Sequence, residues 1–190
     1  MSNNTAVDTL PDSAQAAIAF HESIDPELLD SLREAVNNTN EDFMERYDAE
    51  VWMLAMSSRL ERYVKNPDER MQILTLVRKE ALRADLQPEL VLALIEVESH
   101  FDRFAVSRVG AQGVMQVMPF WKKELGREED NLTVLTTNLR YGCTILKHYL
   151  DKEKGDIRRA LARYNGSLGK DWYPERVFTA YRKNWKGGQI

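Results

Sequence analysis

The sequence predicts an all-α protein, and three observations carry this prediction. Apolar residues recur at three- and four-residue spacing along most of the 190 residues, as in helices that bury one face. No alternating run of apolar and polar residues is long enough to form a useful strand. Nine glycines and six prolines make up about 8% of the chain against a usual ~12%, which disfavours a turn-rich β-sandwich.

Residues 1–66 are expected to form an N-terminal helical extension with a loose start. Residues 1–13 are small and polar, and helical patterns follow from residue 14 to about residue 65. Asp25-Pro26-Glu27 marks a helix start, and Asn37-Asn38-Thr39-Asn40 marks a break. The clearest break in the helical pattern of this half is Asn66-Pro67-Asp68, so a second domain is expected over residues 67–190.

The second domain is expected to contain six helices. Their predicted ranges are 73–82, 87–100, 121–125, 138–150, 157–164 and 174–181. Asp156 is a candidate N-cap, and Pro88 and Pro174 are typical of first helical turns. Residues 102–118 contain glycines and show no periodicity, which indicates a loop with a short turn. Cys143 lies at helical spacing from apolar neighbours and is expected to be buried.

Composition excludes several classes of function. The net charge of −4 disfavours a generic binder of nucleic acid or of anionic membranes. One cysteine and three separated histidines provide neither a disulfide framework nor a metal-ligand pair, so no metal or cofactor is expected.

No membrane span is expected, because no apolar run reaches ~18 residues. The start, MSNNTAVDTLPDS, lacks the basic and apolar parts of a signal peptide, so the chain is either cytosolic or without its export signal.

Glu98 is the most informative residue of the predicted helix 87–100. At 100° per residue from Val91, the apolar side chains occupy an arc from about 240° through 0° to about 40°. Glu98 falls at about 340°, inside this arc, whereas Glu89 and Glu96 fall on the opposite face as ordinary solvated residues. Burial raises the pKa of a carboxyl group, and a protonated carboxylic acid suits general-acid catalysis. The alternative is a structural carboxylate neutralised by an arginine or by backbone donors.

The segment after Glu98 can accommodate a polar ligand. Gly110 and Gly113 permit a tight backbone path, and Ser107 and Gln116 offer hydrogen bonds to hydroxyl and acetamido groups. The spacing over 98–116, E-S-x-F-x-x-x-A-x-S-x-x-G-A-x-G-x-M-Q, resembles the catalytic domain of soluble lytic transglycosylases. These are murein-cleaving enzymes with a goose-lysozyme-like helical fold. A second signature, A-x-Y-N-x-G, appears as Ala162-Arg163-Tyr164-Asn165-Gly166-Ser167, with serine where glycine is usual.

The resemblance covers about residues 70–185 and implies roles for individual residues. Glu98 matches the catalytic acid/base. The positions that match residues around the sugar are Ser107, Gly113, Gln116, Met118 and the active-site tyrosine, Tyr164, while Asn165 matches a residue that helps to build the turn. Glu175 lies out of register with a further glutamate of many family members. We therefore interpret it as an acidic residue of a first helical turn, where the helix dipole favours it.

The implied function is that of a peptidoglycan lytic transglycosylase. Such an enzyme cleaves the β-1,4 bond between N-acetylmuramic acid and N-acetylglucosamine without water and leaves a 1,6-anhydro end. Two alternatives remain, a goose-type lysozyme-like hydrolase and a non-catalytic murein-binding scaffold. The substrate implies a periplasmic or cell-envelope location and therefore an export signal that this sequence lacks. Three roles stay open for the N-terminal helices: to brace the catalytic domain, to dock a protein partner, or to shape one end of the sugar groove.

Two further groups of residues have ordinary interpretations. A basic run is expected to be a solvated face that, if functional, meets the anionic wall polymer rather than nucleic acid; it comprises Arg158, Arg159, Arg163, Lys170, Arg176, Arg182, Lys183 and Lys186. Aromatic residues of the second domain can stack on sugars, but packing is the expected role of each one; they are Trp121, Trp172, Tyr173, Tyr181 and Trp185.

Overall fold

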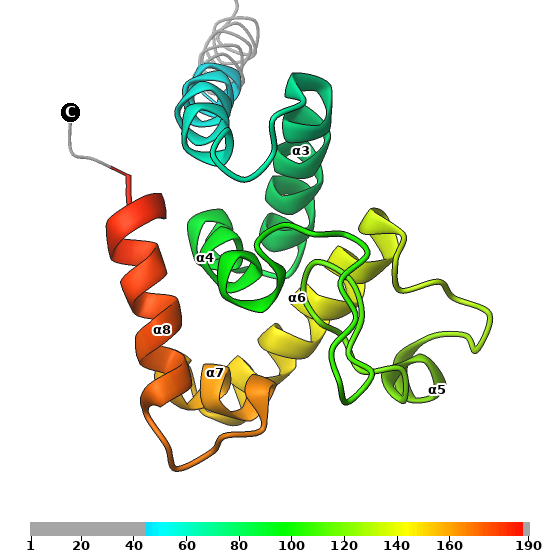
Figure 1. Cartoon of the computed structure of the whole chain (residues 1–190). Helices are drawn as coiled ribbons and strands as arrows, with labels where there is room; N and C mark the ends of the chain where they lie inside the picture. Colours follow the sequence, from blue (N-terminus) through cyan, green and yellow to red (C-terminus); the bar gives the residue numbers. More distant parts are fainter. Residues whose placement is uncertain (1–44, 188–190) are drawn as a thin grey trace, which may run out of the picture. The chain divides into compact units, whose positions relative to one another are not determined.

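A computed structural model describes residues 45–187 of the chain (Figure 1). The chain divides into two compact units, residues 1–50 and 51–190. Residues 45–50 are the described part of the first unit, and they are helical. The helix start predicted at Asp25 and the break predicted at residues 37–40 lie outside the described residues. The account below concerns the second unit.

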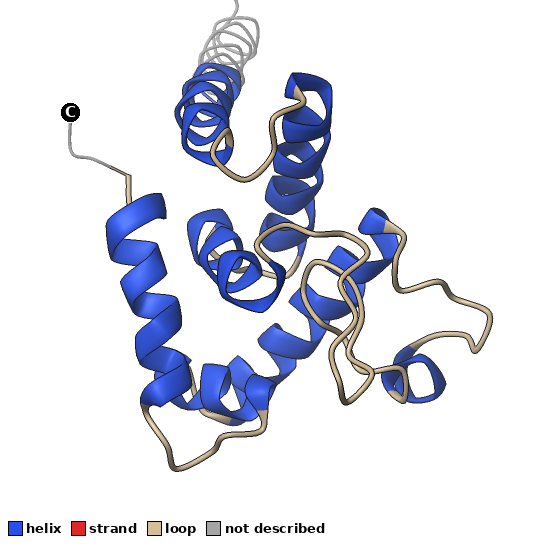
Figure 2. Cartoon of the chain, in the orientation of Figure 1, coloured by secondary structure: helices blue, strands red, loops and turns tan. Residues whose placement is uncertain are grey.

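The regular secondary structure of this unit is helical, as the sequence predicts (Figure 2). Residues 51–60 are helical and are followed by α3 (Pro67–Arg83), α4 (Pro88–Ser99), α5 (Trp121–Leu125), α6 (Leu135–Lys152), α7 (Ile157–Asn165), α8 (Trp172–Ala180) and a π-helical turn η1 (Tyr181–Trp185). Across residues 45–187 no strand forms, and two isolated bridges hold the loop between α4 and α5. None of the helices in this range combines the length and the apolarity that a bilayer crossing requires.

Local capping explains two of the helix starts. The side chain of Asn66 accepts hydrogen bonds from the backbone of Asp68 and Glu69, and Pro67 follows as the first helical residue of α3. Asp156 caps α7 by accepting from the backbone N–H of Arg159 at 3.1 Å, which confirms the predicted cap. The start predicted for α6 is three residues late, because burial of Leu135 extends the helix through two threonines of low helix propensity.

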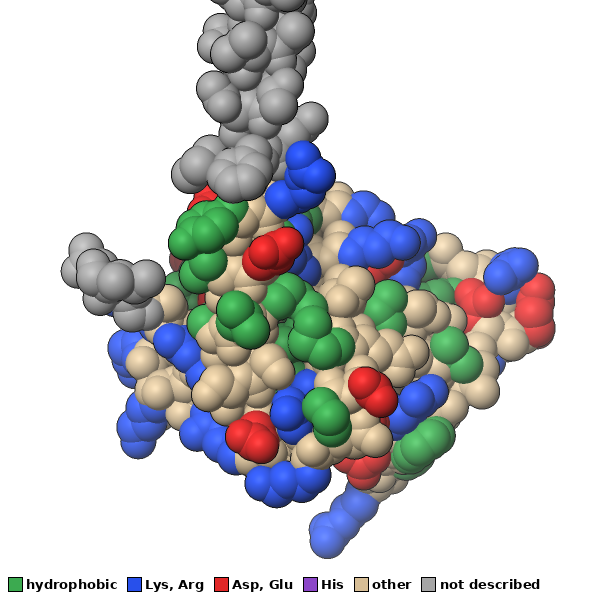
Figure 3. All heavy atoms as spheres, turned by 90° about the horizontal axis from the view of Figure 1, so that it is seen from above, with side chains coloured by type: hydrophobic (Ala, Val, Ile, Leu, Met, Phe, Trp, Pro, Cys, Tyr) green, Lys and Arg blue, Asp and Glu red, His purple; other side chains and the backbone are tan. Residues whose placement is uncertain are grey.

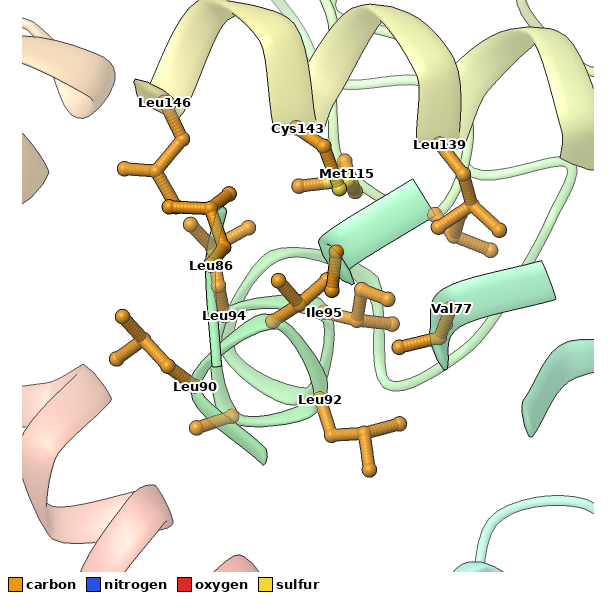
Figure 4. Packing of buried hydrophobic residues seen from close by; sticks show 14 of the residues in the cluster. Val77, Leu86, Leu90, Leu92, Leu94, Ile95, Met115, Leu139, Cys143 and Leu146 are labelled. Atoms are coloured by element: carbon orange, nitrogen blue, oxygen red, sulfur yellow. The ribbon is translucent and has the colours of Figure 1, made fainter. Parts of the chain in front are cut away.

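Helix α4 forms the centre of the core. Leu92, Leu94 and Ile95 are fully buried, and α3, α8 and η1 all pack against this helix. Figure 4 shows the α4 side chains facing those of α6, with Met115 of the loop beside Cys143. Cys143 is fully buried, as predicted. Because neighbours surround α4 on several sides, the position of its C-terminal end is firmly fixed.

Two glutamates of α4 correct a prediction. Glu89 and Glu96 were expected to be solvated, and both are partly buried. Trp52 donates its indole N–H to Glu89 at 2.8 Å, and Trp185 donates its indole N–H to Glu96 at 2.6 Å. The prediction is wrong because a helical wheel considers one helix alone. Here residues 51–64, with Met56, Leu60 and Val64 in the core, cover part of the polar side of α4, and η1 covers another part.

Candidate active site

The catalytic candidate Glu98 lies at the junction between α4 and the long loop. Helix α4 ends because His100 adopts a left-handed conformation with φ of 52°, and Phe101 follows with φ of 68°. The hydroxyl of Ser99 donates to the carbonyl of Val114 at 2.8 Å, which holds the returning loop against the helix end. Glu98 therefore projects from a fixed helix end beside a fixed loop.

The surroundings of Glu98 favour a proton on its carboxyl group. The hydroxyl of Tyr173 donates to Oε1, and the positive charge of Arg176 lies nearby. Both interactions lower the pKa, but burial outweighs them and raises the pKa of Glu98 from 4.5 to about 7. No ion pair neutralises Glu98 among residues 45–187, and the side chain keeps some access to solvent. The group can thus give up or accept a proton near neutral pH.

Tyr173 is a residue of the site that the sequence analysis missed. We expected it to pack, and it is indeed 2% exposed, but its hydroxyl is the hydrogen-bond partner of Glu98. Burial and the Glu98 charge raise its pKa well above 10, so the phenol remains protonated and able to donate. The available signal was the spacing of Tyr173 and Arg176, which lie three residues apart and therefore share one face of α8.

Tyr164 connects α7 with the loop. Its hydroxyl donates to the carbonyl of Met115 at 2.7 Å, and burial together with the Glu98 charge raises its pKa well above 10. The turn after α7 relies on backbone groups: Gly166 has φ of +75°, and the N–H of Ser167 donates to Ala162 at 2.7 Å. Asn165 is the last residue of α7 and is exposed.

The loop between α4 and α5 contains Ser107, Gly113 and Gln116. The hydroxyl of Ser107 accepts from the N–H of Ala111 at 3.0 Å. The amide of Gln116 donates to the carbonyls of Ala105 at 3.1 Å and Gly113 at 3.0 Å. These polar side chains thus hold the loop itself in shape.

Gly113 and Met118 of the loop differ in the space around them. Gly113 has φ of +75°, and a Cβ there would lie 2.3 Å from the side-chain nitrogen of Asn138 and 2.4 Å from the carbonyl oxygen of Leu132, so glycine is required. Met118 is partly buried where the loop approaches α5, which leaves part of its side chain accessible.

Asn138 of α6 is a second residue that the sequence analysis missed. It is 1% exposed, and its Oδ1 accepts from the N–H of Met115 at 2.8 Å. Its Nδ2 donates to the carbonyls of Gln112 and Leu132, each at 2.8 Å. One buried amide therefore fixes the loop segment that also binds Tyr164. The signal was an amide on the otherwise apolar face of α6.

Glu175 behaves as the sequence analysis expects. It lies in the first turn of α8, where the helix dipole favours an acid. It pairs with Arg158 at 2.6 Å and with Arg182 at 3.7 Å. Arg158 is the main reason that the pKa of Glu175 is lowered. Glu175 is thus an ionised residue of a surface ion pair.

Comparison with known proteins matches this chain to transglycosylases. A family model described as "Transglycosylase SLT domain" matches residues 75–184. A protein named "Transglycosylase" from Enterobacteria phage PRD1 is 35% identical over 100 residues, which are 49% of this chain and 37% of the phage protein. "Membrane-bound lytic murein transglycosylase C" of Actinobacillus pleuropneumoniae serotype 5b is 52% identical over 48 residues, 25% of this chain and 13% of that protein.

A solved structure also matches part of the chain. An inactive variant of the lytic transglycosylase Slt from Pseudomonas aeruginosa is 30% identical, with a TM-score of 0.47, and the match covers 50% of this chain and 17% of that one. The chain thus spans little more than a third of the phage relative and smaller parts of the other two proteins.

Proposed function

The chain belongs to the transglycosylase SLT domain family, and from this premise we propose that it is a peptidoglycan lytic transglycosylase, a lyase acting on murein glycan strands. One observation carries the proposal. Glu98, which matches the acid/base position of the first signature, has a pKa of about 7 and accepts a hydrogen bond from the buried Tyr173. A carboxyl group in this state can serve as both proton donor and proton acceptor at neutral pH.

The proposed reaction moves one proton in each direction. Protonated Glu98 gives its proton to the oxygen that joins N-acetylmuramic acid to N-acetylglucosamine, and the bond from the anomeric carbon to this oxygen breaks. The acetamido group of the substrate stabilises the cationic carbon. The Glu98 carboxylate then takes the proton from the C-6 hydroxyl of the same muramic acid, and this oxygen bonds to the anomeric carbon. No water is consumed, and the internal nucleophile has a high effective concentration.

Tyr173 has a defined part in this scheme. Once Glu98 has given up its proton, the carboxylate must persist in a partly buried place until the C-6 hydroxyl delivers another proton. The hydrogen bond from Tyr173 stabilises this ionised form and keeps the pKa of Glu98 from rising further. The walls around the sugar are proposed to consist of Ser107, Gly113, Gln116, Met118 and Tyr164. Asn165 is proposed to support the turn beside them.

The proposal also concerns location. Murein lies outside the cytoplasm, and we infer that the chain acts in the cell envelope. The relatives named as membrane-bound lytic murein transglycosylases support this location.

The decisive variant is Glu98→Gln, which keeps the shape of the side chain and removes its ability to give up a proton. Its rate of murein cleavage should fall at least about 100-fold, because positioned acid/base groups usually supply ~10²–10⁴-fold. Glu124→Gln is a matched control, since Glu124 is an exposed residue of α5. A Glu98→Gln variant that retains more than about a hundredth of the activity contradicts the assignment.

The product tests the lyase chemistry separately. Mass spectrometry of the wild-type digest should show disaccharide products that lack one water relative to lysozyme products, because the ring closes internally. Products with ordinary reducing ends would replace this conclusion with the goose-type hydrolase, and absence of cleavage would favour the murein-binding scaffold.

A further inference from the structure

The basic run of the second domain separates into two sets in the structure. Arg159 and Arg163 both pair with the carboxylate of Glu153, and Arg158 pairs with Glu175. These arginines have their charge compensated by neighbouring acids. This part of the run is thus a surface on which the fold interleaves acids with the arginines.

The second set surrounds a groove formed by chain segments that are far apart in the sequence. Residues 58–62 and 183–186 line an open groove of about 370 Å³ that contains Arg59, Arg62, Lys183 and Lys186. None of these four cations forms an ion pair with an acid of the described range 45–187. Arg59 donates to the carbonyl of Lys186 at 2.9 Å, and the guanidinium of Arg62 lies 4.9 Å from the ring centre of Tyr63. Neutral partners thus position both arginines, and no acid of the described residues forms an ion pair with either of them.

This basic groove, as we call it from here on, adjoins a second groove that is lined by residues of α4, α8 and η1. Lys183 and Asn184 also line this adjacent groove of about 460 Å³, which reaches Val97 and Arg176. Val97 precedes Glu98 in the chain, and the charge of Arg176 acts on Glu98. In Figure 3, as in Figure 1, α8 lies on the left. Several Lys and Arg side chains line that side of the molecule.

The acids of the adjacent groove are already engaged. Glu96 accepts hydrogen bonds from Trp185 and from Asn184, the latter at 2.7 Å, and Glu175 is held by Arg158. Among the residues that line the two grooves, five cations (Arg59, Arg62, Arg176, Lys183 and Lys186) outnumber these two acids, so the net charge of the lining is positive. Such a lining attracts an extended anionic ligand and raises its local concentration.

Most of the basic groove lies outside the residues that define the family. Arg59, Arg62 and Lys186 all fall outside the range 75–184 that the family model matches. The whole chain carries a net charge of −4, so general composition does not account for a groove with four cations that lack an acidic partner among residues 45–187. The groove is thus formed mostly by residues outside the matched range.

We propose that the basic groove binds the free carboxylates of the short peptides carried by murein, and so positions the glycan strand at Glu98. This inference rests on the proposed function. The peptides hang from the muramic acid units, and Glu98 is proposed to cleave the bond of such a unit. An anionic group next to the scissile bond is thus part of the substrate itself. A separate phosphate polymer has no such fixed relation to the bond.

The test measures binding without catalysis, in the Glu98→Gln background. Murein sacculi and glycan strands stripped of their peptides serve as the two ligands in a co-sedimentation assay. Lys183→Glu combined with Lys186→Glu reverses two exposed cations of the groove. Lys79→Glu combined with Lys152→Glu reverses two exposed lysines elsewhere and makes the same change in net charge.

The groove variant should bind peptide-bearing murein about tenfold more weakly, since two attractive contacts become repulsive, and it should bind stripped glycan as before. The control variant should stay within about twofold on both ligands. The tenfold effect should shrink at high salt. An equal loss on both ligands, or no loss on peptide-bearing murein, would overturn the inference. Failure of the proposed function would appear separately, as wild-type protein that does not cleave murein.

Discussion

Replacement of Glu98 by glutamine should stabilise the fold while it removes activity. In the wild-type protein, burial makes the ionised carboxylate unfavourable, which is why the pKa rises from 4.5 to about 7. Between about pH 4.5 and pH 7, the folded protein keeps a proton that the unfolded chain has released. The unfolded state binds fewer protons, so this residue makes the free energy of unfolding fall as the pH rises through that window.

The size of the effect follows from the shift in pKa. At about 1.4 kcal/mol for each tenfold change in acidity, a rise from 4.5 to about 7 corresponds to about 3 kcal/mol. Glu98 keeps some contact with solvent, which screens part of this cost, so we expect about 2 kcal/mol. Glutamine stays neutral, retains an oxygen for the Tyr173 hydroxyl and avoids the cost of ionisation. The variant should therefore melt about 4–8 °C higher than the wild type above pH 7.5.

Thermal unfolding of both proteins at pH 4.5 and at pH 8 provides the assay. All other titrating groups are common to the two proteins, so they cancel in the difference between the melting temperatures. The difference should be close to zero at pH 4.5 and should favour the variant at pH 8. A difference that does not change with pH, or a wild type that is the more stable protein at pH 8, would refute the reasoning.

Two further predictions concern the supports of the site. Tyr173→Phe removes a hydrogen bond that lowers the pKa of Glu98. The alkaline limb of the pH profile of kcat/KM should therefore move to higher pH. An unchanged limb would remove Tyr173 from the proposed scheme. Gly113→Ala should lower the free energy of unfolding in urea by about 2–4 kcal/mol, because the new Cβ would clash with Asn138. Gly110 has φ of +89° and open space around it, so Gly110→Ala should lower that free energy by about 1 kcal/mol. Equal losses would contradict the packing argument.

Much of the fold was predictable because its signals are local. The period of apolar residues identified the described helices from α3 to α8, and Asp156 was correctly predicted as a cap. Glu98 was predictable for the same reason, since one helix and its apolar arc were enough to place the carboxylate on the buried side. The rise in its pKa agrees with that interpretation.

The remainder of the site depends on contacts between distant parts of the chain. Tyr173 lies 75 residues from Glu98 in the sequence, and Asn138 lies 23 residues from the Met115 amide that it binds. Glu89 and Glu96 looked solvated because their tryptophan partners come from segments 37 and 89 residues away. Such pairings follow from the three-dimensional arrangement of the helices, which the periodicity of one helix does not specify.

The two indole hydrogen bonds on α4 have a practical consequence for protein production. Trp52 precedes the range matched by the family model and Trp185 follows it, yet both donate to the central helix, and Trp185 is itself fully buried. A fragment trimmed to residues 75–184 would remove both indole donors and leave part of the core open to water. Recombinant versions of this domain should therefore retain residues from 51 onward and extend through at least residue 186.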